Sequence, residues 1–300
     1  MSRVLGLELH GNDAIAVAVD ELGSVLGRAH VSDRDSVGAA AASALATVVA
    51  AVAMPLAGLG VAAIARDAAP VKAALDELAK RYAGPFLREG AVASGTAAAV
   101  GEAWVGAAKD ARDVVFLSVD EHVTAGIVRD GAPFAGAHGR AAAAAWLALN
   151  PVEREDYRKM GCLEAEASAA GIVRRLVWRI KAGDRSRIEN EVKGDLSAIT
   201  VAHALDAARN GDGVAISVVR DTAKYLGMAA ANLVVVVDPA VLVLGGIVAG
   251  SPDVLLELVR TELARRLPRA TLDTLMIAPA KLGAEAAAIG AARLATAALQ

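Results

Sequence analysis

The sequence predicts a two-lobed α/β protein, and three observations lead to this fold class. Its 300 residues are many for one small domain and enough for two lobes. Apolar residues make up 55% of the chain and aromatic residues only 3%, so the core is expected to consist mainly of Ala, Val and Leu. Strand-like and helix-like segments follow one another in a similar order in both halves, which favours a duplicated α/β unit.

Two β-hairpins open the predicted first half, because short polar turns separate its first apolar runs. The stretch 37–65 contains no charged residue and is long enough to span a bilayer. It is mostly alanine, however, and Pro55 divides it, so we expect a buried helix and then a strand instead of a membrane span. The predicted elements are strands 4–9, 14–20, 25–31 and 58–65 and helices 37–53, 70–82 and 96–109.

The second half is predicted to be mostly helical after an opening strand and hairpin. One helix is expected to end at Leu233, followed by the segments LVVVVD and AVLVLGG. The first lobe is predicted to comprise 1–112, with the C-terminal helix 284–300 packing back on it, and the second lobe 113–283. The predicted elements are strands 114–119 and 274–280 and helices 164–181, 198–209, 213–233, one from Pro252 and one from Ala284.

Charge and cysteine content indicate which partners and which cellular compartment to expect. The formal net charge of −3 gives no general reason to expect nucleic acid or an acidic membrane as partner. The basic stretch Arg174–Arg187 is interpreted as a solvated helix end and loop. The single cysteine, Cys162, excludes an intramolecular disulfide and suits the reducing cytoplasm. No basic region followed by an apolar run opens the chain, so no signal peptide is expected.

Three segments together carry a resemblance to a known family: Ala207–Gly250, Leu282–Ala295 and Gly161–Ser168. They contain a helix, an Asp-Pro turn and a strand that enters a double glycine, a closing helix rich in small residues, and a Gly-Cys-x-Glu segment. In these features the chain resembles the ROK family of sugar kinases and regulators, within the actin-like ATPase-domain superfamily. The resemblance implies a two-lobed, ribonuclease H-like fold with a cleft between the lobes, and a homodimer.

The two phosphate loops of the family are altered in this sequence. Active members open with Asp-x-Gly-Gly-Thr, in which backbone amides approach phosphate and the carboxylate helps to hold magnesium. Here only Glu8 and Gly11 correspond to that pattern. The second loop, Gly-Thr-Gly-x-Gly-x-Gly, corresponds to 120–126, where only Gly126 remains. Asp120 and Glu121 would repel a triphosphate there.

The double glycine Gly245-Gly246 is the one nucleotide-contacting motif that is kept. In the family it lets the chain approach adenosine. A tight turn from strand to helix would also select glycine, so both interpretations stay open.

The family's catalytic segment, Asn-Asp-Ala-Asn, corresponds to 93–96. Ser94 therefore occupies the general-base position, although a serine hydroxyl cannot accept a proton from a sugar hydroxyl at neutral pH. Thr96 replaces an amide that would contact sugar. An alternative role for Ser94 is to cap the helix that follows it.

The sugar and zinc segment of the family is also altered. Glu164 remains at a sugar-contact position, but a lone Glu at a helix start also interacts favourably with the helix dipole. Structural zinc needs four ligands, usually Cys and His. Cys162 is the only thiol, so no zinc is expected. The other family positions are occupied here by Ala143, Trp146, Glu155 and Tyr157.

The favoured hypothesis is a non-catalytic ROK-type protein that binds a sugar-like small molecule or a protein. The alternative is a divergent, glucokinase-like kinase that uses ATP, with Glu8, Asp120 or Glu121 holding magnesium. A DNA-binding repressor is disfavoured, because the first strand begins almost at the first residue and no preceding helix-turn-helix is visible.

Overall fold

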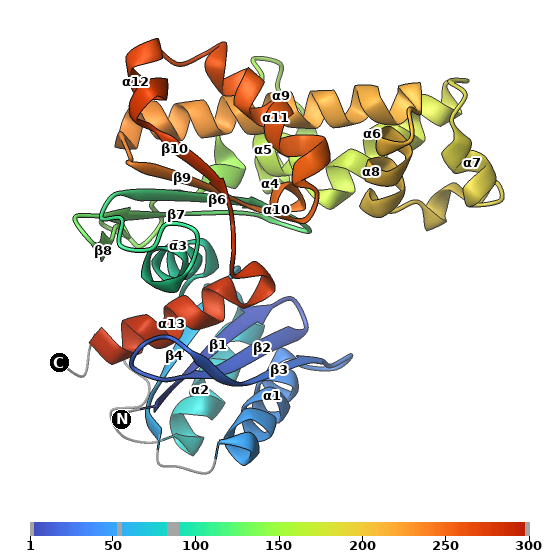
Figure 1. Ribbon diagram of the computed structural model, residues 1–300. Helices are drawn as coiled ribbons and strands as arrows, with labels where there is room; N and C mark the ends of the chain where they lie inside the picture. The colour runs from blue at the N-terminus through green and yellow to red at the C-terminus, as the bar shows by residue number, and fades with distance from the viewer. Residues whose placement is uncertain (1–2, 53–55, 83–89, 298–300) are drawn as a thin grey trace. The chain divides into compact units, whose positions relative to one another are not determined.

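A computed structural model describes residues 3–52, 56–82 and 90–297, and it divides the chain into two compact units (Figure 1). Unit 1 comprises Met1–Phe116, Ala125–Ala142 and Ala280–Gln300, and unit 2 comprises Leu117–Thr124 and Ala143–Pro279. The described residues form two five-stranded sheets, of order β3-β2-β1-β4-β5 and β10-β9-β6-β7-β8. The predicted two-lobed α/β class is thereby confirmed.

The first sheet is mixed, and its parallel strands share one edge. β1 pairs antiparallel with β2 and parallel with β4, while β5 continues the parallel part beside β4. The carboxyl ends of β1, β4 and β5 therefore lie together. The strands of this sheet are β1 (Arg3–His10), β2 (Asp13–Val19), β3 (Val25–Ser32), β4 (Leu56–Ala63) and β5 (Val92–Ala93).

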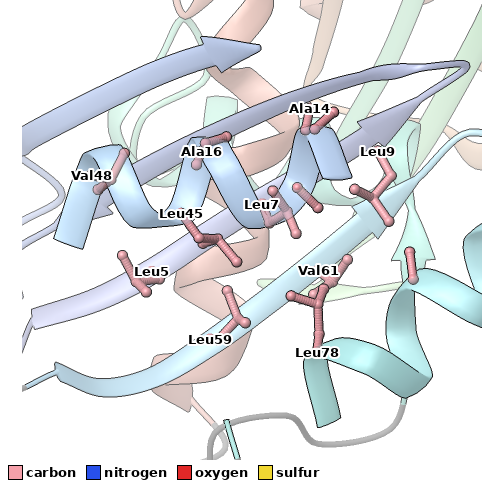
Figure 2. Packing of buried hydrophobic residues seen from close by; sticks show 14 of the residues in the cluster. Leu5, Leu7, Leu9, Ala14, Ala16, Leu45, Val48, Leu59, Val61 and Leu78 are labelled. Atoms are coloured by element: carbon pink, nitrogen blue, oxygen red, sulfur yellow. The ribbon is translucent and has the colours of Figure 1, made fainter. Parts of the chain in front are cut away.

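One face of this sheet is covered by α1 (Val37–Ala51) and α2 (Ala69–Arg81). The hydroxyl of Ser36 accepts hydrogen bonds from the amides of Gly38 and Ala39, which caps the start of α1. Alternate residues of β1 point to this face, as expected for a strand. Figure 2 shows their packing between the two helices and β4; the labelled residues are Leu5, Leu7, Leu9, Ala14, Ala16, Leu45, Val48, Leu59, Val61 and Leu78.

The other face is covered by α13 (Ala286–Ala297), which also packs on α3 (Ser94–Val105). Glycines allow backbone-to-backbone contact here. A Cβ atom on Gly6 or Gly60 would lie 1.8 or 1.9 Å from the carbonyl oxygen of Ala288 or Ala291, respectively. A Cβ on Gly290 would lie 1.7 Å from the carbonyl oxygen of Ala97. No side chain fits at these distances, so only glycine permits this packing.

A buried carboxylate joins α3 to the chain that leads into α13. Glu102 is fully buried, and its Oε1 accepts hydrogen bonds from the amides of Lys281 at 3.0 Å and Leu282 at 2.9 Å. Its Oε2 accepts a bond from the amide of Ala107 at 2.6 Å. These three bonds compensate the burial of the charge and fix the two helices against each other.

Helices dominate unit 2, as predicted. The strands of the second sheet are β6 (Val114–Val119), β7 (Val123–Arg129), β8 (Ala132–Pro133), β9 (Val241–Gly246) and β10 (Met276–Pro279), of which β8 and most of β7 belong to unit 1. The remaining α-helices are α4 (Glu155–Met160), α5 (Cys162–Ala167), α6 (Ala169–Lys181), α7 (Arg187–Glu191), α8 (Val201–Arg209), α9 (Gly213–Val237), α10 (Ile247–Gly250), α11 (Pro252–Ala264) and α12 (Arg269–Thr274).

Two predicted helix boundaries are wrong. The helix expected over 164–181 is broken at Ser168, which is extended and accepts a hydrogen bond from the Gly171 amide at the start of α6. The valine run predicted to follow a helix is its last turn, since α9 continues to Val237. Val234 and Val237 are buried while Val235 and Val236 are exposed, which is helical spacing. Packing of this face overrides the strand preference of valine.

Residues 125–142 group with unit 1, and the predicted lobe bounds stay a prediction. Within this unit Gly126 in β7 lies close to Gly95 in α3. A Cβ on Gly126 would lie 2.0 Å from the carbonyl oxygen of Gly95. In the described residues no helix has the length and apolar character to cross a bilayer. Pro55, at the predicted turn, lies outside the described residues.

Substitution Gly290→Ala tests the backbone contact. The added methyl group would overlap the Ala97 carbonyl, so we expect a loss of about 2 kcal/mol or more in the free energy of unfolding. Urea denaturation monitored by circular dichroism measures this loss. Gly213→Ala is the matched control, because a Cβ at Gly213 in α9 would meet no atom within 4 Å. Equal stability of the two variants would contradict the packing argument.

Candidate functional site

The carboxyl edge of the first sheet brings Glu8 and Ser94 together. Glu8 lies opposite Ala62 of β4, and Ala62 lies opposite Val92 of β5. Ser94 follows β5 directly and is the first residue of α3. By strand alternation Glu8 points to the same face as Gly6, the face covered by α13. In open α/β sheets this edge is the usual position of a ligand site.

The Glu8 carboxyl is largely shielded from solvent, and burial raises its pKa from about 4.5 to about 7, because burial disfavours the charged form. The nearby Ser94 hydroxyl acts in the opposite direction and lowers this pKa. Ser94 Oγ is itself buried. Among the described residues, no group forms a hydrogen bond of full geometry with it. Glu8 therefore exchanges a proton near neutral pH. The sequence pattern contained no sign of this shift.

The predicted capping role of Ser94 is wrong. Ala93 is the N-cap residue of α3, and no side chain caps this helix. Ser94 instead occupies the first helical position, where its hydroxyl faces Glu8. Thr96 lies in the same first turn and is buried, with 2% of its surface exposed. Both residues thus lie at this sheet edge, and neither has an acidic or amide group.

The retained glycines have structural roles. Gly126 leaves no room for a Cβ because the Gly95 carbonyl lies against it. Gly11 has a φ of +57° in the turn between β1 and β2, with open space beside it. Gly246 has a φ of +60°, and its Cβ would lie 2.0 Å from the Val119 carbonyl oxygen. Gly245 is buried within β9. Chain geometry alone therefore explains why Gly11, Gly126 and Gly246 are glycine.

In unit 2 the Glu164 carboxylate binds the loop at the second phosphate-loop position. Glu164 Oε1 lies 2.8 Å from Nδ1 of His122, and Oε2 accepts a hydrogen bond from the Val123 amide at 3.0 Å. Only 16% of the Glu164 side chain is exposed. The sequence does not predict this contact, because 42 residues separate Glu164 from His122. Both oxygens of the predicted sugar-contact residue are thus engaged within the protein.

A hydrogen-bonded ion-pair network includes one of the family's zinc-ligand positions. The Tyr157 hydroxyl donates to Oε1 of Glu166 at 2.5 Å. Arg154 and Arg175 each donate to the same carboxylate at 3.1 Å. Burial and the Glu166 charge raise the pKa of the Tyr157 hydroxyl above its usual value, so it stays a donor. Cys162 is buried at the start of α5.

These positions do not form a metal cluster. Within the described ranges, no three His, Cys, Asp or Glu side chains gather in a way that could hold a metal ion. The network on Glu166 consists of a phenol and two guanidinium groups, which are not zinc ligands. The absence of zinc in the protein stays a prediction.

Comparison with known proteins gives consistent matches. The model of the ROK family matches residues 4–298. A glucokinase of Halalkalibacterium halodurans is 34% identical over 198 residues, which cover 64% of this chain and 59% of that enzyme. The Escherichia coli DNA-binding transcriptional dual regulator NagC is 29% identical over 159 residues, covering 53% of this chain and 38% of the regulator. These matches span less than two thirds of either relative.

A solved structure shows the same fold. The ROK family glucokinase of Streptomyces griseus, in complex with glucose and AMPPNP, superposes with a TM-score of 0.81 at 24% identity. The match covers 99% of this chain and 100% of the glucokinase.

Substitution Glu8→Gln tests whether the pKa of the Glu8 carboxyl is raised. Between about pH 4.5 and 7 the unfolded chain has released the Glu8 proton and the folded chain keeps it, so the wild type loses stability as pH rises through this window. Glu8→Gln removes this loss, which is on the order of 2–3 kcal/mol for such a shift. Urea denaturation at pH 5 and pH 8 measures it. Ser94→Ala, which keeps the carboxyl, should retain the pH dependence. A pH dependence that is the same in wild type and Glu8→Gln would show that Glu8 titrates normally.

Proposed function

We propose that this chain, which belongs to the ROK family, binds a small sugar-like molecule without transferring phosphate to it. The observation that carries the proposal is the pair of Glu8 and Ser94 at the carboxyl edge of the first sheet. Where a kinase needs a carboxylate base, the chain has Ser94, a hydroxyl that stays protonated at neutral pH. The similar S. griseus glucokinase structure contains glucose and AMPPNP. We extend the binding of a sugar, but not the binding of a nucleotide, to the present chain.

The groups that would receive MgATP do not fit it. Glu8 is the one carboxyl at the first phosphate-loop position, and a carboxyl that is partly protonated near pH 7 is a weak ligand for Mg²⁺. At the second position the loop carries Asp120 and Glu121, whose charges oppose those of a triphosphate. The backbone of this loop is held by Glu164 through Val123, so this amide already has an acceptor.

A divergent sugar kinase is the second candidate, and one observation favours it. A carboxyl with a pKa near 7 is well suited to general acid–base chemistry, and Glu8 has this property beside the family's base position. In such an enzyme Glu8 would accept the proton from the sugar hydroxyl, and Asp120 or Glu121 would hold magnesium. The two candidates differ in one respect that can be measured, namely sugar-dependent turnover of ATP and its dependence on Glu8.

The proposed assembly is a homodimer, as the family resemblance implies. The proposed location is the cytoplasm, because a single cysteine suits a reducing compartment. A role in DNA binding is not part of the proposal. The similarity to the regulator covers only 38% of that protein.

Substitution Ser94→Asp tests whether the missing base is the only defect. We expect no detectable phosphorylation of glucose, mannose or N-acetylated hexosamines by the wild type or by Ser94→Asp in an ATP-coupled assay. The new carboxylate would supply a base, but positioning and charge stabilisation provide most of the catalysis of phosphoryl transfer. The sugar would still lack the amide, carboxylate and imidazole that family members carry where this chain has Thr96, Ala143 and Trp146.

The same sugars test the binding half of the proposal by thermal shift, because a ligand of the folded state raises the midpoint of unfolding. At least one sugar or amino sugar is expected to raise it, in the absence of ATP. Turnover by the wild type that is lost in Glu8→Gln would establish the divergent kinase. Turnover in Ser94→Asp alone would show an intact substrate site. If none of these sugars raised the midpoint of unfolding, the proposal of a sugar-like ligand would be contradicted.

A further inference from the structure

Unit 2 contains a cavity of about 580 Å³ between α4, α5, α6 and α9. Sites for small organic molecules commonly have this size. The cavity is distinct from the site that holds Glu164. Glu166, which lines the cavity, lies two positions after Glu164 on α5, and residues with this spacing point to different sides of a helix. Glu164 binds the loop at His122, whereas Glu166 binds the arginines of the cavity wall.

The charge of the cavity wall favours an anion. Four of its residues are cationic, namely Arg154, Arg174, Arg175 and Lys224, and two are carboxylates, Glu166 and Asp221. The Glu166 carboxylate is already neutralised, since two of these arginines and Tyr157 donate to it. Arg174 pairs with Asp156. Lys224 lies 3.7 Å from Asp221, a distance that leaves its ammonium group available for further acceptors.

Arg175 is the deepest of these cations. Its Nη1 donates to Glu166 and its Nη2 donates to Oγ1 of Thr222 at 2.5 Å. Its Nε is buried and has no hydrogen-bond partner among the described residues. This Nε has almost no accessible surface, so a ligand would meet the guanidinium group at Nη2, where Thr222 engages one of the two N–H groups. The planar group is held in place by Glu166 and Thr222, and its second Nη2 N–H is the donor that a phosphate oxygen would use.

An exposed aromatic side chain lies beside these charges. Trp178 follows Arg175 by one helical turn on α6, and 69% of its surface is exposed. Tyr225 on α9 lines the same cavity, and the centre of its ring lies 6.0 Å from Cζ of Arg175. A large exposed indole is unusual on a surface without a partner, and its flat face provides a platform for a ring.

We propose that this cavity binds a phosphate monoester carried on a ring, with the phosphate at Arg175 and Lys224 and the ring against Trp178. A sugar phosphate and an aryl phosphate share this chemistry. The mixture of cations, carboxylates and an aromatic face suits both, because hydroxyl groups of a sugar would also find an acceptor in Asp221.

Calorimetric titration of the full chain with glucose 6-phosphate and with phenyl phosphate tests the proposal. We expect at least one of them to bind about tenfold or more tightly than inorganic phosphate, and glucose and phenol to bind more weakly than their phosphates. Lys224→Glu and Trp178→Ala should each weaken the binding by about tenfold or more. Both side chains are exposed, and unchanged unfolding midpoints would confirm that both variants fold.

The matched controls are Lys181→Glu and Phe134→Ala. Lys181 is exposed at the end of α6, and Phe134 is 49% exposed; neither lines the cavity, so both variants should bind as the wild type does. Binding of glucose 6-phosphate alone would identify the ligand as a sugar phosphate. Binding of phenyl phosphate alone would identify it as an aryl phosphate. Two results would overturn the proposal: neither monoester binds more tightly than inorganic phosphate, or Lys224→Glu and Trp178→Ala leave the affinity unchanged. Binding that Lys224→Glu and Trp178→Ala weaken belongs to this cavity and not to the sheet edge at Glu8 and Ser94, so the failure of this proposal and the failure of the proposed function are distinguishable.

Discussion

The backbone of α13 lies directly against the backbones of the first sheet and of α3, and the position of the candidate site depends on this contact. Gly6, Gly60 and Gly290 make it possible, because each would bring a Cβ within 2 Å of a carbonyl oxygen. Glu102 then anchors the chain that enters α13 by accepting hydrogen bonds from two of its amides. With α3 held in this way, its first residue, Ser94, meets the carboxyl edge of the sheet beside Glu8. Close packing thus places Ser94 beside Glu8 without any contribution from a ligand.

Two carboxylates on α5 serve contacts within the protein. Glu164 is held by His122 and by a backbone amide, and Glu166 is held by Tyr157 and two arginines. A carboxylate with both oxygens satisfied gains little from a ligand, because binding would require the internal bonds to be replaced. Glu8 differs from both, since burial keeps it partly protonated near neutral pH. Its pKa suits proton transfer at the sheet edge, and it is therefore the residue on which the two candidate functions differ.

The sequence predicted the architecture well, because short polar turns and apolar runs are local signals. The strand 114–119 was predicted with the bounds that the structure has. The prediction failed where packing decided: the valines up to Val237 are helical because two of them are buried at helical spacing. For the candidate site, the assignment of residues to the family's functional positions stays a prediction, and the sequence did not predict the partners of these residues. The contact between Glu164 and His122 joins residues far apart in the chain, and the pKa of Glu8 depends on surroundings supplied by other segments. Periodicity carries no information about either.

The measurement that tests the account most directly is the affinity of MgATP, determined by calorimetric titration of the wild-type chain with adenosine in parallel. If the phosphate-binding positions have lost their function, MgATP should bind with a Kd in the millimolar range or weaker, about −4 kcal/mol or less favourable. Adenosine should then bind as well as MgATP, because the triphosphate gains no amide donors and meets carboxylates at 120 and 121. A micromolar Kd for MgATP, far below that of adenosine, would show that the chain holds a triphosphate and would contradict the account.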